Sequence, residues 1–266
     1  MKKIRLDQIV LDRGLASSRE KAKSSIMAGQ VFINGQRMDK PGMSVPEDAN
    51  VELKGKALPY VSRGGLKLEK ALETFQISPA GMVCLDCGAS TGGFTDVLLK
   101  NGAKLVYAVD VGYGQLAWSL RCDERVVVME RTNIRYVTPD MLTALPELVV
   151  IDLSFISIRL VLPVIWNLTK DEASVICLIK PQFEAGKEKV GKKGVVRDKE
   201  THFQVLESFR DFARGSGFSI LAFCYSPLKG PEGNIEYLSL LKKGGHETAN
   251  PDIRALVDAA HCELDS

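Results

Sequence analysis

The chain has 266 residues, 45% of them hydrophobic, which is enough for one or two domains with packed cores. Its net charge of +2 is uneven, because residues 1–56 hold eleven Lys or Arg against seven Asp or Glu and the remainder carries −2. No apolar run approaches a membrane span, and no apolar signal core follows the basic first residues. We therefore expect a soluble, cytoplasmic protein whose N-terminal part binds a polyanion, the alternative being a merely solvated basic face.

Six cysteines lie scattered along the chain, and the only close pair is Cys84-x-x-Cys87. That spacing suits redox or metal chemistry, but no second Cys or His pair accompanies it, and the three histidines are distant in sequence. We expect reduced cysteines that pack as small core residues, and no metal site.

The first 56 residues show the pattern of a small α+β domain. Apolar residues from 6 to 15 are spaced for one helix face, and Gly14 can end that helix. Ser17-x-x-Glu20 is a capping box that predicts a second helix over 18–28. Asn34-Gly35 then predicts a hairpin within 31–38, followed by a strand at 50–53.

The stretch RLDQIVLDRGLASSREKAKSSIMAGQVFINGQ, residues 5–36, resembles an S4-type RNA-binding domain. The residues agree with this reading, because a rigid basic surface can contact phosphates without reading bases. Proline and few apolar residues mark a linker at 57–61, so we expect an S4-type domain at 1–56 and a second domain at 62–246. Residues 247–266 are expected to form a polar tail with a short helix over 253–262.

An amphipathic helix is predicted within 62–75, because four apolar residues from Leu68 to Phe75 share one face. Lys67 lies at the edge of that face, and this segment by itself favours a solvated lysine. Further on, apolar strands alternate with helical segments, which predicts an open, doubly wound α/β sheet. Seven strands are expected, the last two as a hairpin, at 82–86, 105–110, 126–129, 148–152, 174–179, 219–225 and 235–241.

A turn of small residues, Gly88 to Gly93, joins the first of these strands to a helix that begins near Phe94. Glycines let a ligand approach the backbone, and the helix start supplies free N–H donors. The second strand ends in Asp110, which is placed to hold ribose hydroxyls. The turn matches neither a P-loop nor a strict G-x-G-x-x-G, so alone it predicts only a nucleotide-like ligand.

Three charged residues lie at strand ends on the rim where open α/β sheets bind ligands. Asp152 follows the fourth strand, Lys180 follows the fifth, and Glu236 stands at the start of the antiparallel seventh. One such residue could be a structural ion pair, but all three beside a nucleoside-holding turn favour a catalytic site. Phe94, Phe155 and Phe183 could stack on a displaced base, although aromatic residues near strand ends are more often part of the core.

Together with Lys67, these residues resemble the Lys-Asp-Lys-Glu tetrad of RNA 2′-O-methyltransferases of the FtsJ/RrmJ type. The segments VSRGGLKL, LDCGASTGGFTDVLL, VDVGYGQL, DLSFIS, LIKPQFE and GNIEYL, in this order after an S4-like domain, resemble more narrowly the haemolysin-A (TlyA) family of ribosomal RNA cytidine 2′-O-methyltransferases. The resemblance implies a Rossmann-like, seven-stranded class I methyltransferase domain. It also implies S-adenosylmethionine as cofactor and ribosomal RNA or a ribosomal subunit as partner, with no membrane and no obligate protein partner.

Methyl transfer to a ribose hydroxyl requires the oxygen, the methyl group and the sulfur to be aligned, and a proton to be accepted. We assign the base to Lys180, whose pKa partial burial and a second ammonium would lower, and the orienting cation to Lys67. Asp152 and Glu236 would hold the two lysines, and Asp152 would also lie near the methyl donor.

The remaining site candidates come from the same reading. The expected cofactor-binding residues are Asp86, Gly88, Ala89, Ser90, Thr91, Gly92, Gly93, Phe94, Asp110, Glu130, Arg131 and Asp152. The expected RNA-binding residues are Arg5, Arg13, Arg19, Lys21, Lys23, Arg63, Lys187, Lys189, Lys192 and Lys193. The last four belong to a basic, glycine-containing loop at 183–197, which we interpret as an RNA clamp or, alternatively, as an ordinary solvated loop.

Three other functions compete with this prediction. A non-catalytic RNA-binding or ribosome-assembly protein would not need Lys180 at a strand end. A membrane-active haemolysin, suggested by the historical family name, would need a long apolar or amphipathic segment that the chain lacks. A methyltransferase for a base or small molecule would show an Asn/Asp-Pro-Pro type of turn where this chain has Asp-Leu-Ser-Phe.

Overall fold

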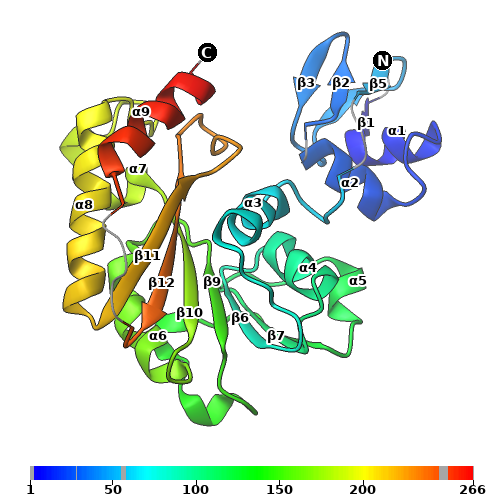
Figure 1. Ribbon diagram of the computed structural model, residues 1–266. Helices are drawn as coiled ribbons and strands as arrows, with labels where there is room; N and C mark the ends of the chain where they lie inside the picture. The colour runs from blue at the N-terminus through cyan, green and yellow to red at the C-terminus, as the bar shows by residue number, and fades with distance from the viewer. Residues whose placement is uncertain (1–2, 28, 55–57, 246–250, 266) are drawn as a thin grey trace. The chain divides into compact units, whose positions relative to one another are not determined.

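The computed structural model describes residues 3–27, 29–54, 58–245 and 251–265, and it separates into two compact units, Met1–Gly65 and Leu66–Ser266. The predicted boundary at 56 and 57 and the tail residues 247–250 lie outside the described residues. We describe each unit by itself, with the labels of Figure 1.

The first unit is a small α+β fold around one apolar core. Its elements are β1 (Lys3–Arg5), α1 (Leu6–Asp12), α2 (Arg19–Met27), β2 (Val31–Ile33), β3 (Gln36–Met38), β4 (Ser44–Pro46) and β5 (Val51–Leu53). The predicted Asn34-Gly35 hairpin is confirmed, because β2 and β3 pair antiparallel around these two residues, which both have positive φ. The predicted capping box is wrong by one residue, since Ser18 Oγ accepts the hydrogen bond from Lys21 N–H at 3.2 Å.

The second unit contains the predicted seven-stranded sheet, in the order β11-β12-β10-β9-β6-β7-β8. Its strands are β6 (Val83–Cys87), β7 (Leu105–Val109), β8 (Val126–Met129), β9 (Leu148–Ile151), β10 (Ser174–Ile179), β11 (Phe218–Tyr225) and β12 (Tyr237–Lys243). Strand β12 is antiparallel to both β10 and β11, which confirms the predicted terminal hairpin. It begins two residues later than predicted, because the Asn234 and Glu236 carbonyls accept hydrogen bonds inside the hairpin loop, from Gly230 and Ser226.

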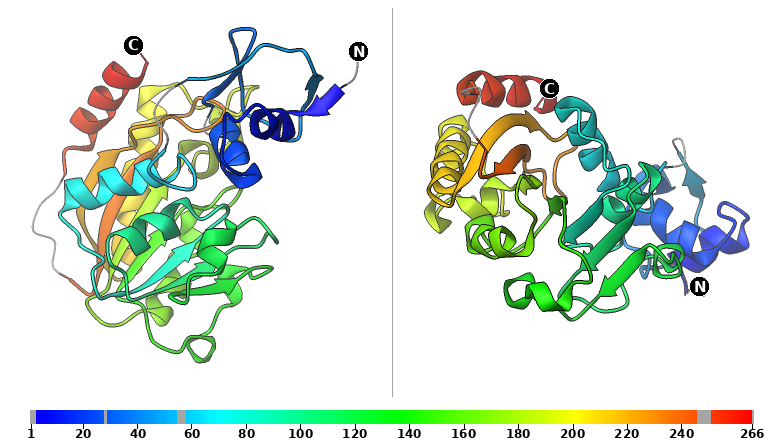
Figure 2. Two further views of the ribbon diagram at one scale, coloured as in Figure 1. Left: turned by 90° about the vertical axis from the view of Figure 1, so that its right-hand side faces the viewer. Right: turned by 60° about the horizontal axis from the view of Figure 1, so that its bottom comes forward.

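Helices cover both faces of this sheet, as Figures 1 and 2 show. The helices of this part are α3 (Gly65–Phe75), α4 (Gly93–Lys100), α5 (Trp118–Arg121), α6 (Leu162–Leu168), α7 (Pro181–Glu184), α8 (Lys199–Gly215) and α9 (Ile253–Leu264). Helices α6, α8 and α9 share a core cluster with alternate residues of the strands. Helices α3 and α4 lie on the other face, and the predicted apolar stripe of α3 is buried. Because the connections are parallel crossovers, the carboxyl ends of the parallel strands meet on one rim.

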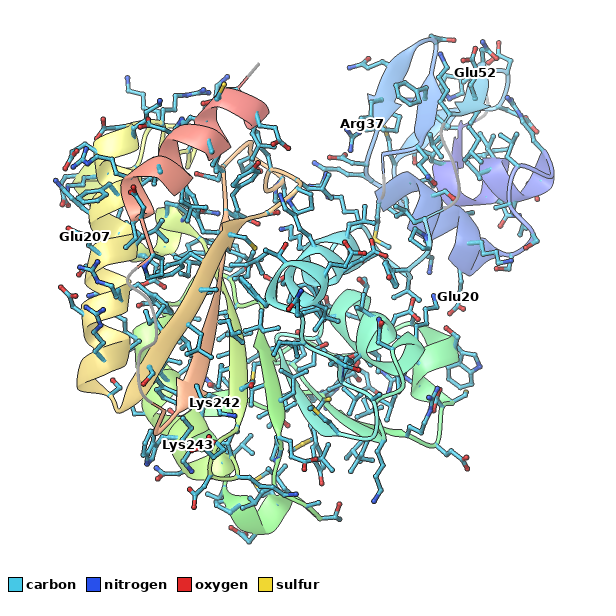
Figure 3. The ribbon with its side chains drawn as sticks, in the orientation of Figure 1. Glu20, Arg37, Glu52, Glu207, Lys242 and Lys243 are labelled. Carbon is cyan, nitrogen blue, oxygen red and sulfur yellow. The ribbon has the colours of Figure 1, made fainter. Side chains whose placement is uncertain are left out.

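Charged side chains of α8 such as Glu207, labelled in Figure 3, point away from the sheet.

No helix in the described ranges is both long and apolar enough to cross a membrane. All six cysteines are free, and four of them are buried as expected, but the core position expected for Cys122 and Cys262 is wrong because both are exposed.

Candidate active site

The glycine turn lies directly after β6 and joins it to α4, which begins at Gly93 as the sequence predicts to within one residue. Gly88 has φ 93°, and a Cβ placed there would lie 2.2 Å from the backbone oxygen of Asp152. Only glycine fits this position without movement of the neighbouring strand end. Ser90 also has a positive φ, and its N–H donates to Asp110 Oδ2 at 2.8 Å.

Asp110 follows β7 and lies on the same rim of the sheet as the glycine turn. Its second oxygen accepts a hydrogen bond from Gly112 N–H at 2.6 Å, so its carboxylate ties the end of β7 to the glycine turn. Between these elements lies a cavity of about 440 Å³, a size suited to a nucleoside-like ligand. It is lined by Gly88, Ser90, Val109, Asp110, Val111, Gln115, Thr132, Asn133, Ile134, Asp152, Leu153, Ser154, Phe155 and Ile156.

The cavity includes some of the expected cofactor-binding residues and not others. Gly88, Ser90, Asp110 and Asp152 line it. The residues absent from its lining are Ala89, Thr91, Gly92, Gly93 and Phe94, of which Ala89 and Phe94 are buried. Thr132 and Asn133 also line the cavity, and they directly follow the expected residues Glu130 and Arg131 in the chain. Their neighbours Glu130 and Arg131 are placed elsewhere.

Glu130 accepts a hydrogen bond from Arg121 at 2.6 Å, and this bond, together with backbone hydrogen bonds from Gly114 and Leu116, lowers the pKa of Glu130 to about 2. Arg131 lies over the ring of Tyr113, 4.1 Å from its centroid. Sequence reasoning missed the apolar lining residues, among them Val111, Ile134 and Ile156. Their signal is weak, because an apolar residue after a strand end is also typical of an ordinary core position.

Asp86, on β6 beneath the turn, is fully buried. Its Oδ2 accepts a hydrogen bond from Thr95 Oγ1 at 2.7 Å, while Oδ1 has no hydrogen-bond partner among the residues that the structure describes. Burial raises the pKa of Asp86 to about 7, and the carboxylates of Asp152 and Asp110 add to the rise against the Thr95 hydrogen bond. This carboxyl group therefore changes its charge near neutral pH.

Lys180 stands at the end of β10, where its side chain is 9% exposed. Its Nζ lies 2.5 Å from Asp152 Oδ1 and donates a hydrogen bond to Ser154 Oγ at 3.0 Å. The loop after β9 thus supplies two partners for one lysine. Ser154 is a site residue that the sequence reasoning missed, although it lies within the quoted segment DLSFIS.

Lys67 and Glu236 form the second ion pair of the rim, and both are buried. The expectation of a solvated Lys67, drawn from its helix alone, is therefore wrong, because its partner is the residue just before β12, 169 residues away. Ile179 pairs with Tyr237 between β10 and β12, so Lys180 and Glu236 follow at adjacent positions of the two strands. Topology and register thus bring the two ion pairs to the same edge of the sheet.

Two aromatic residues accompany Lys180. Phe155 is 91% exposed, has φ 67° and lines the cavity, and its ring centroid lies 5.3 Å from that of Phe183. Phe94 is buried, as expected of a core aromatic, but the core role expected for Phe155 is wrong. A bulky residue in left-handed backbone is strained, and such strain gathers at functional sites.

The expected RNA-binding residues differ in exposure and in whether they already form hydrogen bonds within the protein. Asp7, which is buried, accepts hydrogen bonds from Arg5 and Arg19, and Arg13 donates to the carbonyls of Ala49 and Glu47. The other candidates in the two units are mostly solvent-facing: Lys21, Lys23, Lys187, Lys189, Lys192 and Lys193 are exposed, and Arg63 is half-buried. Lys189 also donates to Gln204.

Comparison with known proteins agrees with this fold. Residues 60–243 match the model of the FtsJ-like methyltransferase family, and residues 4–51 match the S4 domain. The chain is 52% identical to YqxC of Bacillus subtilis, covering 99% of this chain and 96% of that one. It is 45% identical to the 16S/23S rRNA (cytidine-2′-O)-methyltransferase TlyA of Mycobacterium tuberculosis, covering 98% and 97%. A solved structure described as a hemolysin from Streptococcus thermophilus has a TM-score of 0.78 at 48% identity, covering 100% and 98%.

The sheet order, the glycine turn and the cavity at the strand ends define a Rossmann-like methyltransferase that uses S-adenosylmethionine. The chain belongs to the FtsJ-like methyltransferase family, and within it to the S4-containing group named TlyA or hemolysin A. The residues present fit the cofactor, because Gly88 and Ser90 of the glycine turn line the cavity and Asp110, across from them, offers carboxylate oxygens for ribose hydroxyls.

Proposed function

We propose that this protein methylates the 2′-oxygen of a ribose in ribosomal RNA, at a cytidine, and that it does so in the cytoplasm. The observation that carries the proposal is the Lys180 ion pair with Asp152 at the mouth of the cavity, beside the buried Lys67–Glu236 pair. The names of relatives such as TlyA supply the ribosomal RNA and the cytidine.

The two ion pairs have different tasks in this proposal. S-adenosylmethionine supplies an electrophilic methyl group on its sulfonium. Lys180 Nζ acts in its neutral form: it orients the ribose 2′-hydroxyl and accepts the hydroxyl proton as the oxygen–methyl bond forms in place of the methyl–sulfur bond. Lys67 is the orienting cation, and Asp152 and Glu236 hold the two amines in place. Ser154 restricts Nζ further, because the hydrogen bond between them leaves fewer rotamers available.

A target nucleotide that is base-paired must leave its helix to reach this site. Phe155, exposed at the edge of the cavity and in contact with Phe183, offers a flat apolar surface on which an extruded base can stack. The S4 unit and the basic loop at 183–197 supply the phosphate contacts that hold the RNA while this happens.

The decisive experiment incubates the protein with methyl-labelled S-adenosylmethionine and unmodified ribosomal subunits, followed by mapping of 2′-O-methyl groups at nucleotide resolution. We expect label at cytidine riboses. Label in a base, in protein or in lipid would contradict the proposal, and binding of RNA without any label would favour a non-catalytic assembly role.

The role of Lys180 is tested by the Lys180→Ala variant in the same assay. We expect its methylation rate to fall by about 10² to 10⁴, the range typical of lost acid–base catalysis, while S-adenosylmethionine binds with nearly unchanged affinity. Lys170→Ala is the matched control, because Lys170 lies at the opposite end of the sheet in an exposed ion pair with Glu147. Full turnover by Lys180→Ala would exclude it as the base.

A further inference from the structure

Two loops carry the reacting side chains of the site. The first, residues 152–157, follows β9 and holds Asp152, Ser154 and Phe155. The second consists of Lys180 and α7 (Pro181–Glu184), directly after β10. The loops touch at successive positions: Lys180 meets Asp152 and Ser154, and the ring of Phe183 meets that of Phe155. The third junction lies farther from the cavity and is made by Glu184.

Glu184 uses both carboxylate oxygens to hold the first loop. Its Oε2 accepts a hydrogen bond from Ser157 Oγ at 2.7 Å, and its Oε1 accepts one from Ile158 N–H at 2.8 Å. Arg159 Nε lies 3.7 Å from Oε2, close enough for an ion pair but too far for a hydrogen bond. All three partners are consecutive in sequence, so one side chain fixes the end of the loop in position and in orientation.

A carboxylate in this place is destabilising by itself. The Glu184 side chain is 1% exposed, and burial raises its pKa against the opposing effects of Ser157, Ile158 and Arg159. An apolar residue would fill the same space without that penalty, but it could not accept from the buried Ile158 N–H. The arrangement therefore favours fixed loop geometry over stability, which is how supporting residues of catalytic sites operate.

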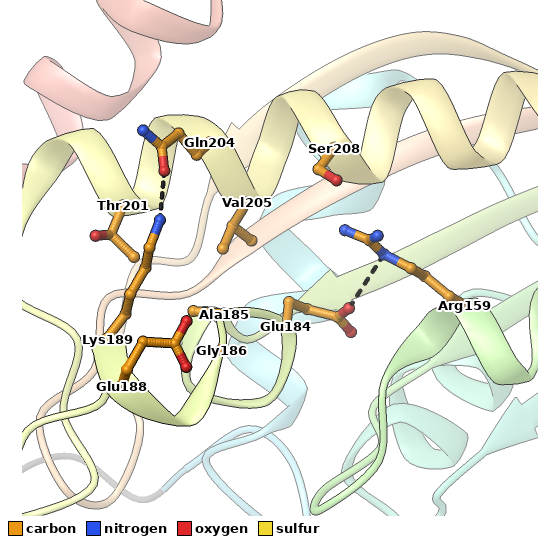
Figure 4. Close-up of a pocket in the computed structure, with 10 residues that line it drawn as sticks. All are labelled: Arg159, Glu184, Ala185, Gly186, Glu188, Lys189, Thr201, Gln204, Val205 and Ser208. Carbon is orange, nitrogen blue, oxygen red and sulfur yellow. Dashed lines mark hydrogen bonds and ion pairs between the residues drawn. The ribbon is translucent and has the colours of Figure 1, made fainter.

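Glu184 is separate from the cavity of the methyl donor. It lines a second cavity of about 300 Å³, drawn in Figure 4, together with residues of α8 and of the segment after α7. The Glu184 carboxylate points across toward the Arg159 guanidinium there. A substitution of Glu184 can thus loosen the junction between the two loops without removing any side chain that faces the methyl donor or the acceptor.

We propose that Glu184 is a positioning residue that holds the second loop, with Lys180, against the first loop, with Asp152. It thereby sets the positions of Lys180 Nζ and of the Phe155–Phe183 pair for methyl transfer. This role rests on the proposed function. It requires Glu184 to act on the rate of the chemical step and not on the affinity for S-adenosylmethionine.

The first test measures single-turnover methylation of unmodified ribosomal subunits by Glu184→Gln, which keeps the shape of the side chain and removes its charge and one acceptor. We expect the rate to fall about ten- to a hundredfold, because a misplaced reacting group costs rate steeply, while the Kd for S-adenosylmethionine stays within twofold. Glu188→Gln is the matched control, because Glu188 is an exposed glutamate four residues on that lines the same cavity. An unchanged rate in Glu184→Gln, or an equal loss of cofactor binding, would overturn the proposal.

Ser157→Ala separates positioning from general stability. If Glu184 acts through Ser157, the double variant should be no slower than Glu184→Gln alone, whereas independent structural damage would multiply the two losses. Multiplied losses, together with a matching drop in thermal stability, would contradict the positioning role.

A readout that does not depend on methylation keeps this claim distinct from the proposed function. Brief acetylation followed by peptide mass spectrometry reports the reactivity of Lys180, with Lys170 as internal standard. We expect Lys180 to react at least about threefold faster in Glu184→Gln than in the unaltered protein, because a loosened loop exposes an amine that is now buried. Unchanged reactivity would overturn the proposal even if no RNA were methylated, whereas faster reactivity in a protein inactive on all RNA would contradict only the proposed function.

Discussion

Asp86 connects the chemistry of one residue to the binding of the cofactor. In the unliganded protein its pKa is raised to about 7, chiefly by burial, so the carboxyl group is largely protonated below neutral pH. Its Oδ1 has no hydrogen-bond partner within the described ranges, and Asp86 lies on the strand that leads into the turn proposed to hold the positively charged cofactor. A cation favours the carboxylate form, so binding must lower the pKa of Asp86 and release its proton.

From this linkage we predict that the affinity for S-adenosylmethionine rises with pH up to about 7 and is constant above it. A Kd roughly tenfold weaker at pH 6 than at pH 8 follows if the pKa falls by two units or more on binding. Titration calorimetry at the two pH values measures this difference. Asp86→Asn, which cannot ionise, should show the same Kd at both, and equal affinities in the unaltered protein would contradict the prediction.

At the scale of elements, the glycine turn depends on backbone shape more than on any side chain. Gly88 and Gly81 both have positive φ, but a Cβ at Gly88 would meet the Asp152 backbone oxygen at 2.2 Å, whereas nothing lies within 4 Å of one at Gly81. The two positions therefore separate conformational strain from steric collision. Strain alone at such a φ costs about 1–2 kcal/mol for a residue with a Cβ.

We predict that Gly88→Ala lowers the affinity for S-adenosylmethionine by at least tenfold, because the end of β9 must move away from the turn. Gly81→Ala should lower thermal stability slightly and leave the affinity unchanged. Differential scanning fluorimetry with and without the cofactor measures both effects. The result would be contradicted if the two variants bound the cofactor equally well.

The sequence predicts such elements well where their signal is local. The seven strands of the large sheet, the Asn34-Gly35 hairpin and the buried face of α3 follow from apolar periodicity and turn residues, and the structure confirms them, whereas the short strands β1 and β4 were not predicted. Contacts between distant segments were out of reach. Lys67 is expected in solvent until Glu236 is placed beside it, and Glu184 has no distinguishing pattern because its partners Ser157 and Ile158 lie on another loop.

The exposure of Phe155 was likewise hidden from the sequence, for a related reason. An apolar residue after a buried strand is normally part of the core, and only the left-handed backbone at φ 67° turns this one outward. Register, by contrast, was accessible: because β12 runs antiparallel to β10, its beginning meets the end of β10, and Glu236 reaches the rim beside Lys180 as predicted.

At the scale of the whole molecule, the net charge differs between the N-terminal part and the rest of the chain, which indicates different functions for the two parts. The first 56 residues carry a net +4, but their arginines are partly engaged with Asp7 and with backbone carbonyls. Lys21 and Lys23 are exposed on α2, where they can pair with phosphates. Each phosphate that a lysine neutralises releases counterions, which makes RNA affinity fall with salt.

We therefore predict that the double variant Lys21→Gln/Lys23→Gln binds ribosomal RNA more weakly at low salt and shows a shallower salt dependence. The slope of log K against log salt should decrease by about one to two, roughly one for each phosphate that is no longer neutralised. Its methylation rate at saturating RNA should stay unchanged, because neither lysine belongs to the methyltransferase unit. Filter binding over a range of salt concentrations measures the slope.

The control for this prediction removes the same charge elsewhere. Lys104 precedes β7 and Lys170 precedes β10, so both exposed lysines lie at the edge formed by the amino ends of the strands, opposite the rim that carries Lys180. Lys104→Gln/Lys170→Gln should leave the slope unaltered, because this edge is far along each strand from the site where RNA must reach Lys180. An equal decrease in both double variants would mean that RNA affinity depends only on the total charge of the protein. It would contradict the prediction that the N-terminal unit is the RNA-binding part.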